Sequence, residues 1–285
     1  MADKPTKVGA LERLTQKYNV DVGANRILKY DQSWYSIAAP EGDVDLKSVT
    51  TVLDVFPKGM GFKLWLQKYG DDADRIRDEA GQMGTRVHKM IEVTLRGEVV
   101  IFENEDGTRN CSLEEWERYL SWCLWYQEER KTNDMKPLFI EQIVYSVDLG
   151  VAGTVDLIAQ TKRGIEIYDW KTGSFVGDTA EIQVSTYLVL ANLMKVFGEV
   201  GFSSIVQMNP SLNRKGFRVT EVEDVQENFK TFGNCLNIWN RVNKKAVPKY
   251  RTYPNKVDLT ALDAGEIGPF DHAKIKDKVA GALNG

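Results

Sequence analysis

The sequence predicts an α/β fold, a central mixed β-sheet flanked by helices with a helical N-terminal elaboration. In the first half of the chain, apolar residues recur at helical spacing, as at Phe62, Trp65, Leu66 and Tyr69, which is the pattern of an amphipathic helix. In the second half, short apolar runs bounded by turn residues are typical of strands. The 285 residues contain no internal repeat and no low-complexity linker, so we expect one elaborated domain.

Helices and strands are expected in a definite order. A strand, a turn and a second strand occupy 26–37, helices follow at 50–56 and 62–69, and a longer helix covers 76–95 until Gly97 stops it. The next helix, 112–130, has Ser112 as its N-cap. Further strands are expected at 138–147, 153–159, 165–170, 202–208 and 216–220, and further helices at 178–197 and 222–242.

Two of these helices carry specific expectations. In 112–130 the apolar side consists of Leu113, Trp116, Leu120 and Leu124, which we expect to be buried. Asp178, with Glu181 three residues later, resembles a capping box that opens the helix over 178–197.

Composition excludes several classes of protein. Apolar residues make up 42% and charged residues 27%, which is ordinary for a globular protein and unlike a disordered or collagen-like chain. The sequence has no run of about 18 apolar residues for a membrane span, and residues 1–7 lack the apolar stretch of a secretion signal. A cytoplasmic protein is therefore expected. The net charge of −4 excludes a uniformly basic coat but allows a local basic groove.

The most informative stretch is a predicted hairpin, 150–171. If Thr161-Lys162-Arg163-Gly164 forms its turn, Asp156 and Asp169 face each other on neighbouring strands. Directly opposed like charges destabilise a sheet. Ile165, Ile167, Asp169 and Lys171 share one face because alternate residues of a strand point the same way. The apolar end of that face can enter the core while its polar end opens into a cleft.

A divalent cation resolves the repulsion between the two aspartates. Mg²⁺ takes oxygen ligands, and two carboxylates, a backbone carbonyl, water and a substrate phosphate form a typical set. The carbonyl of Trp170 lies between Asp169 and Lys171 and is a candidate ligand. Lys171 can orient an attacking water or stabilise negative charge on phosphorus. The alternative is a surface hairpin whose acids are solvated and whose lysine forms a salt bridge.

Four elements, in order, resemble the PD-(D/E)XK nuclease superfamily, specifically its RecB-like branch of phage-type exonucleases, which includes the mitochondrial genome-maintenance exonuclease. The Gly-x-x-Asp element is 153–156, Asp-x-Lys-Thr-Gly is 169–173, Gln-x-x-x-Tyr is 183–187, and the upstream helical histidine is in 84–88. Ser48-Val49-Thr50 also resembles the stretch that often opens phage members. The resemblance covers about 45–190 and implies a restriction-endonuclease-like core.

The resemblance also implies roles for individual residues. It makes His88 a metal ligand, and imidazole suits Mn²⁺ better than Mg²⁺. It implies that Gln183 and Tyr187 contact the nucleic-acid backbone or help to place Lys171. Two acidic residues stay open: Glu92 can hold the imidazole or face solvent, and Glu141, in the strand before the hairpin, can be a third carboxylate ligand or a surface residue.

Several residues are candidates for contacting DNA. Arg86 and Lys89 flank His88, and Arg214 with Lys215 form a short basic group; such residues give sequence-independent, salt-sensitive binding to phosphates. Thr172 continues the Asp-x-Lys motif next to a glycine, where small residues let a strand approach closely. Bases of a single strand can stack on aromatic residues, for which Trp34, Tyr35, Trp65 and Trp170 are candidates.

The resemblance implies four parts of the chain. They are an N-terminal arm and hairpin at 1–47, a helical elaboration carrying His88 at 48–135, the nuclease core at 136–245 and a C-terminal tail at 246–285.

The expected function is that of a metal-dependent DNase with Mg²⁺ or Mn²⁺, catalysing with Asp156, Asp169 and Lys171. The branch implies an exonuclease on single-stranded or end-bearing DNA in repair, recombination or replication, with possible protein partners from those processes. A structure-specific endonuclease and a non-catalytic nucleic-acid-binding module are the alternatives. Cys111, Cys123 and Cys235 are scattered and lack a CxxC spacing, so we expect no iron–sulfur cluster.

Overall fold

The computed structural model describes residues 24–29, 32–37 and 43–248. One eight-stranded sheet forms its centre, in the order β1-β2-β3-β5-β6-β7-β8, and β4 pairs with β5. The β3–β5 and β6–β7 pairs are parallel and the others antiparallel. The strands are β1 (Ala24–Lys29), β2 (Gln32–Ile37), β3 (Val44–Ser48), β4 (Lys136–Ser146), β5 (Val151–Thr161), β6 (Gly164–Lys171), β7 (Val200–Met208) and β8 (Phe217–Glu221).

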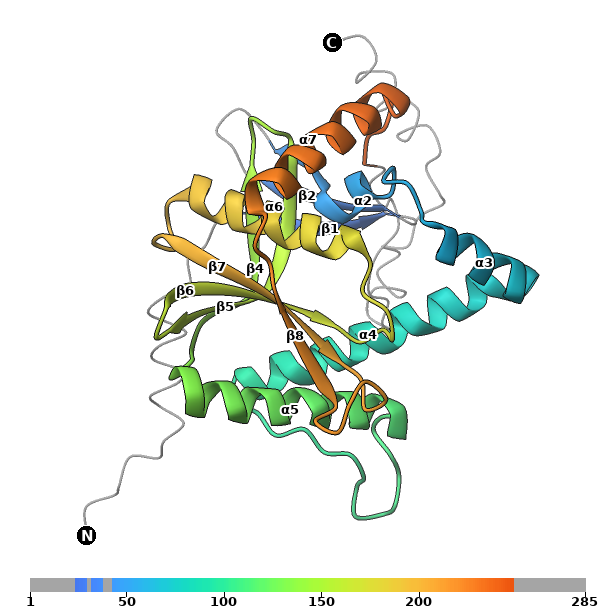
Figure 1. Cartoon of the computed structure of the whole chain (residues 1–285), viewed down its shortest axis with the longest axis vertical. Helices are drawn as coiled ribbons and strands as arrows, with labels where there is room; N and C mark the ends of the chain where they lie inside the picture. The colour runs from blue at the N-terminus through green and yellow to red at the C-terminus, as the bar shows by residue number, and fades with distance from the viewer. Residues whose placement is uncertain (1–23, 30–31, 38–42, 249–285) are drawn as a thin grey trace, which may run out of the picture.

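Helices cover both faces of this sheet, which confirms the predicted fold class. They are α2 (Val49–Leu53), α3 (Met60–Tyr69), α4 (Ala73–Leu95), α5 (Leu113–Asn133), α6 (Asp178–Met194) and α7 (Val225–Val242), with the 3₁₀ turn η1 (Gly70–Asp72) between α3 and α4. Helices α6 and α7 lie on one face, and the long helix α4 crosses the other beside α5 (Figure 1). None of the described helices is long and apolar enough to cross a membrane.

The two faces of β6 contribute to two separate cores. Ile167 packs with Ile158 and the apolar residues of α6 and α7, as the predicted alternation requires. Tyr168 and Trp170 point to the other side and join the aromatic residues of α5, including Trp122 and Trp125. The alternation therefore sends Asp169 and Lys171 toward the α6 side of the sheet.

Strand β5 is paired along one whole edge but only at the two ends of the other. β4 runs beside it from the Lys136–Gln160 pair to the Ser146–Val151 pair. On the opposite edge β3 reaches only Val151 and Ala152, and β6 begins at Leu157. The sheet is therefore split between β3 and β6 at residues 153–156 of β5, and polar groups can collect in this split.

Helix α5 corrects one prediction. Ser112 is its N-cap and forms a full capping box with Glu115, as the sequence indicated for Ser112. However, Leu113, Leu120 and Leu124 are exposed. The side that is buried carries the aromatic residues Tyr119, Trp122 and Trp125 instead, because large rings remove more apolar surface from water than the leucines do.

Two other expectations differ from the structure. Asp178 is the first residue of α6, and the N-cap is Gly177 without a side-chain cap, so the predicted capping box at Asp178 is wrong. Strand β3 was not predicted, because its sequence Val-Asp-Leu-Lys-Ser is short and half polar. The predicted N-terminal arm before β1 and nearly all of the predicted tail from 246 lie outside the described residues. The four-part division stays a prediction.

Candidate active site

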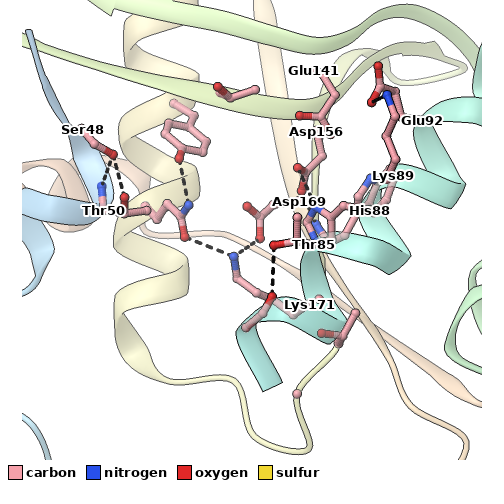
Figure 2. Close-up of a pocket in the computed structure, with 18 of the residues that line it drawn as sticks. Ser48, Thr50, Thr85, His88, Lys89, Glu92, Glu141, Asp156, Asp169 and Lys171 are labelled. Carbon is pink, nitrogen blue, oxygen red and sulfur yellow. Dashed lines mark hydrogen bonds and ion pairs between the residues drawn. The ribbon is translucent and has the colours of Figure 1, made fainter. Parts of the chain in front are cut away.

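A cavity of about 680 Å³ occupies the split in the sheet. Its walls come from the β3–α2 junction, the middle of α4, strands β4, β5 and β6, and the start of α6 (Figure 2). All seven residues predicted for catalysis or metal binding line it: His88, Asp156, Asp169, Trp170, Lys171, Gln183 and Tyr187. These residues come from four separate elements.

The β5–β6 hairpin sets the two aspartates side by side. Its pairing runs from Thr161–Gly164 to Leu157–Tyr168, which is the predicted register, and Asp156 and Asp169 are the next residues on each strand. Instead of a further backbone pair, the Asp156 carboxylate accepts a hydrogen bond from the Trp170 N–H at 2.7 Å. Asp156 is 8% exposed and Asp169 4%, so both carboxylates are largely removed from water.

The pKa values of these aspartates move in opposite directions. Burial is the largest cause raising the pKa of Asp169, and the charge of Asp156 adds to it; Lys171 opposes both. For Asp156, burial also acts upward, but His88, the Trp170 N–H and Lys171 together hold its pKa below the usual value. The pair therefore carries negative charge that its neighbours only partly offset.

His88 approaches Asp156 from the other side of the cavity. Its helix α4 is fixed against the sheet by the buried side chains of Val87 and Ile91, and this places His88 Nδ1 3.2 Å from Asp156 Oδ1. Burial alone lowers the pKa of His88, but the charges of Asp156, Glu141 and Asp169 outweigh it, so the pKa is raised.

Glu141 lies beside His88 and Asp156 in the cavity. The structure therefore gives its position, while its role as a metal ligand stays a prediction. Ligand atoms of His88, Glu141 and Asp156 all lie within 4.8 Å of one another. Its β4 neighbours Ile140 and Gln142 pair with Leu157 and Val155, so Glu141 stands opposite Asp156. Its backbone is left-handed, with φ of 52°. This conformation is uncommon for a residue other than glycine and is often found at functional sites.

Lys171 is held by two partners. Its Nζ lies 2.6 Å from Asp169 Oδ2 and donates to Gln183 Oε1 at 3.1 Å. The Gln183 amide in turn donates to the Tyr187 hydroxyl at 2.8 Å. Burial raises the pKa of Tyr187 well above its usual value, which keeps the phenol neutral. The predicted Gln-x-x-x-Tyr pair thus forms a chain of contacts that ends at Lys171.

Steric contact explains why the Gly-x-x-Asp element begins with a glycine, Gly153. A Cβ on Gly153 would lie 2.2 Å from Cε1 of Tyr187. Only glycine therefore lets the Tyr187 ring approach β5 this closely.

The residues predicted to contact DNA have different surroundings. Arg86 pairs with Glu115 and Lys215 with Glu128. Lys89 pairs with Glu92 at 2.8 Å, and Arg96 also pairs with Glu92 at 2.9 Å. Thr172 is buried and lines the cavity with Lys89. Arg214 lies in the turn between β7 and β8, at the same end of the sheet as Lys171.

Two buried residues hold the chain that follows Lys171, and sequence reasoning did not find them. Arg118 of α5 donates to the Thr172 carbonyl at 2.9 Å, and Gln207 of β7 donates to the Gly173 carbonyl at 2.8 Å. Arg118 and Thr172 are 54 positions apart, so no local pattern connects them.

Of the four aromatic candidates for stacking, Trp34, Tyr35 and Trp170 are buried, and Trp65 of α3 is partly exposed.

The donor set fits a divalent cation. Carboxylate oxygens are the ligands that Mg²⁺ and Mn²⁺ prefer, and one imidazole nitrogen shifts the preference toward Mn²⁺. Negative charge on the buried aspartates, which Lys171 and His88 only partly offset, supplies the driving force for binding the cation.

Comparison with known proteins agrees with this chemistry. The sequence profile of the PD-(D/E)XK nuclease superfamily matches residues 63–256, more than half of the chain. The chain belongs to this superfamily. The matched range includes the cavity residues of α4, β4, β5, β6 and α6.

Other comparisons are more distant. Among solved structures the PD-(D/E)XK chain is similar to the alkaline exonuclease LHK-Exo from Laribacter hongkongensis, with 10% identity over 70% of this chain and 91% of that one and a TM-score of 0.33. It is also similar to LHK-Exo in complex with dAMP, with 12% identity over 70% and 94% of the two chains and a TM-score of 0.32. The search of the curated proteins found no match.

Proposed function

We propose that the protein is a metal-dependent deoxyribonuclease that hydrolyses phosphodiester bonds, and that it acts as an exonuclease on single-stranded or end-bearing DNA. One observation carries the proposal. Two buried aspartates from neighbouring strands share a cavity with an ion-paired lysine and a histidine. Such a group is costly to bury without a bound cation.

The cation would be Mg²⁺ or Mn²⁺, held by Asp156, Asp169, Glu141 and His88, with the Trp170 carbonyl as a further ligand. When bound, it supplies Lewis acidity that activates water and offsets charge on the leaving oxygen. Lys171 places its positive charge toward the scissile phosphate, where negative charge builds in the transition state. Gln183, positioned by Tyr187, keeps the ammonium group pointed there.

The finer assignment rests on sequence. The order of the four motifs favours the RecB-like branch and, with it, DNA ends as substrates and a role in repair, recombination or replication. Helix α4 forms one wall of the cavity between Ala80 and Glu92, and a wall of this kind favours a free end over an internal site. Arg86, Lys89, Thr172, Arg214 and Lys215 are the proposed contacts to the DNA backbone.

A cleavage assay tests the proposal. The protein is incubated with end-labelled single-stranded, linear duplex and closed circular DNA in Mg²⁺, Mn²⁺ or EDTA. We expect loss of the ended substrates in either metal, intact circles, and no loss in EDTA. Lys171→Ala should lower the rate about 10²–10³-fold, because it removes a charge aimed at the transition state.

The control variant is Lys230→Ala, which removes an exposed lysine of α7 that pairs with Glu227 and should keep the full rate. Cutting of circles would select the endonuclease alternative. Absence of cleavage with every metal and substrate would select the non-catalytic module, and an unchanged rate for Lys171→Ala would refute the proposed mechanism.

A further inference from the structure

The loop between β6 and α6, residues 172–177, presents an exposed ring beside the catalytic cavity. Phe175 is 82% exposed. It stands two residues after Gly173, which lines the cavity, and the loop joins Lys171 at the end of β6 to the helix that carries Gln183. A single exposed apolar residue is common on protein surfaces, so Phe175 indicates a binding surface only together with the residues around it.

Helix α3 supplies the second observation. It has no buried residue, although its rings are ordered in a row. Phe62 and Trp65 stack with ring centroids 5.8 Å apart, and Trp65 and Tyr69 follow at 5.5 Å. On the same helix, Met60 is 67% and Leu64 59% exposed. Helix α3 therefore offers aromatic and apolar surface without forming part of either core.

The charge of α3 itself is positive, whereas the segment between α3 and Ala80, residues 71–79, carries five acidic residues against Arg75 and Arg77. Lys58, Lys63 and Lys68 lie in 58–70, and 58–70 contains no aspartate or glutamate. Lys68 Nζ sits 4.9 Å from the centroid of the Tyr69 ring. Cations interleaved with aromatic rings are the surface on which single-stranded nucleic acid binds.

Both features lie beside the same half of α4. Helix α3 leads through η1 into α4 (Figure 1), and Ala80 and Gly81 of α4 line the cavity. Ala80 is seven residues after the start of α4 at Ala73, a rise of about 10 Å. The 172–177 loop meets α4 one turn further on, where a Cβ on Gly84 would lie 3.1 Å from Thr172 Oγ1.

We propose that Phe175 and α3 form a base-stacking path that leads a single strand of DNA into the catalytic cavity, an inference that rests on the proposed function. Phe175 stacks on a base next to the phosphate in the cavity. Lys63 and Lys68 contact the backbone further out. Single-stranded DNA fits because its bases expose flat faces and its backbone is anionic, whereas a duplex hides those faces in its own stack.

Binding measured in EDTA tests this path without hydrolysis. Fluorescence anisotropy compares a labelled oligodeoxythymidine with an abasic oligonucleotide of the same length and charge. We expect the wild-type protein to bind the base-bearing strand at least 10-fold more tightly, because each stacked base contributes about that factor. Phe175→Ala should lower this ratio about 10-fold and Phe175→Trp should keep it.

Matched variants separate stacking from charge and from general surface effects. Val99, 83% exposed on the loop between α4 and α5, is the control, and Val99→Ala should keep the ratio. The double variant Lys63→Ala/Lys68→Ala should keep the ratio as well but should lower the slope of log affinity against log salt by about 1.4, since two phosphate contacts are lost.

Two results would overturn the stacking path: equal affinity of the wild-type protein for the two oligonucleotides, or an unchanged ratio in Phe175→Ala with its folded state verified by circular dichroism. Either result leaves the cleavage assay unaffected. Conversely, a protein that shows the ratio in EDTA but never cleaves DNA with metal would refute the proposed nuclease and leave the binding path intact.

Discussion

The two ends of the β5–β6 hairpin both bury carboxylates, but they compensate them in different ways. At the turn end Glu166 is 1% exposed; it accepts from Arg163 at 2.9 Å and from Ser204 at 2.7 Å. Arg163 also binds Glu221 through both carboxylate oxygens, at 2.7 and 2.8 Å. At the other end, Asp156 and Asp169 border an open cavity.

This difference shows that burial alone does not distinguish a structural carboxylate from a candidate metal ligand. One carboxylate oxygen of Glu166, Oε1, accepts from a guanidinium and a hydroxyl within the protein, while Oε2 accepts no hydrogen bond from the described residues. Asp169, by contrast, has its pKa raised by burial and by Asp156 despite its contact with Lys171. A cation bound in the open cavity can stabilise the negative charge of Asp156 and Asp169.

Two substitutions to glutamine test the comparison, one of Glu166 at the turn end and one of Glu141, the β4 residue opposite Asp156 at the other end; Glu141→Gln should give the larger effect of the two. It removes a proposed ligand charge, so the cleavage rate should fall about 10²-fold. Stability in EDTA should stay the same or rise, because the change removes repulsion between Glu141 and Asp156. Cleavage kinetics and thermal unfolding measure the two effects. A full rate for Glu141→Gln would remove Glu141 from the metal site.

Glu166→Gln should show the opposite behaviour. A neutral amide meets the Arg163 guanidinium less well than a carboxylate does, and the free energy of unfolding should fall by about 2 kcal/mol. The cleavage rate per folded molecule should not change. Urea unfolding followed by tryptophan fluorescence gives the first quantity. A loss of activity without a loss of stability would mean that both ends of the hairpin serve catalysis.

The affinity for metal should depend on pH because His88 titrates, and this effect should be smaller than those of the two glutamate substitutions. The pKa of His88 is raised above its usual value, and an imidazolium cannot bind a metal ion. Below that pKa, the affinity for Mn²⁺ should therefore fall by up to about 10-fold for each pH unit removed; above it the affinity should level off. Asp156 does not contribute to this slope near neutral pH, because its pKa is lowered.

Calorimetric titration with Mn²⁺ between pH 6 and pH 8 measures this dependence. His88→Asn should bind more weakly and with a flatter pH profile. The same pH slope in His88→Asn and in the wild-type protein would show that another group releases the proton.

Local patterns predicted the elements that local forces specify. The turn at 161–164 fixed the hairpin register, since pairing outward from a turn leaves one alignment, and this brought Asp156 beside Asp169. Ser112 was recognised as an N-cap because its hydroxyl caps the N–H of Glu115 within the same turn. The buried side of α5 was not predicted correctly, because its leucines and its aromatic residues both recur at helical spacing. Only packing against the sheet, at Trp170, makes the aromatic side the buried one.

By itself, the sequence determined the hairpin and the helices around it and supplied the candidate site residues, because turns, caps and side-chain periodicity act over a few residues. Only the tertiary structure decided that Glu141 stands opposite Asp156, that His88 reaches Asp156 across 68 positions, and that Arg118 holds the chain after Lys171. These contacts depend on how α4, α5 and β4 pack on the sheet, and packing between distant segments leaves no local pattern.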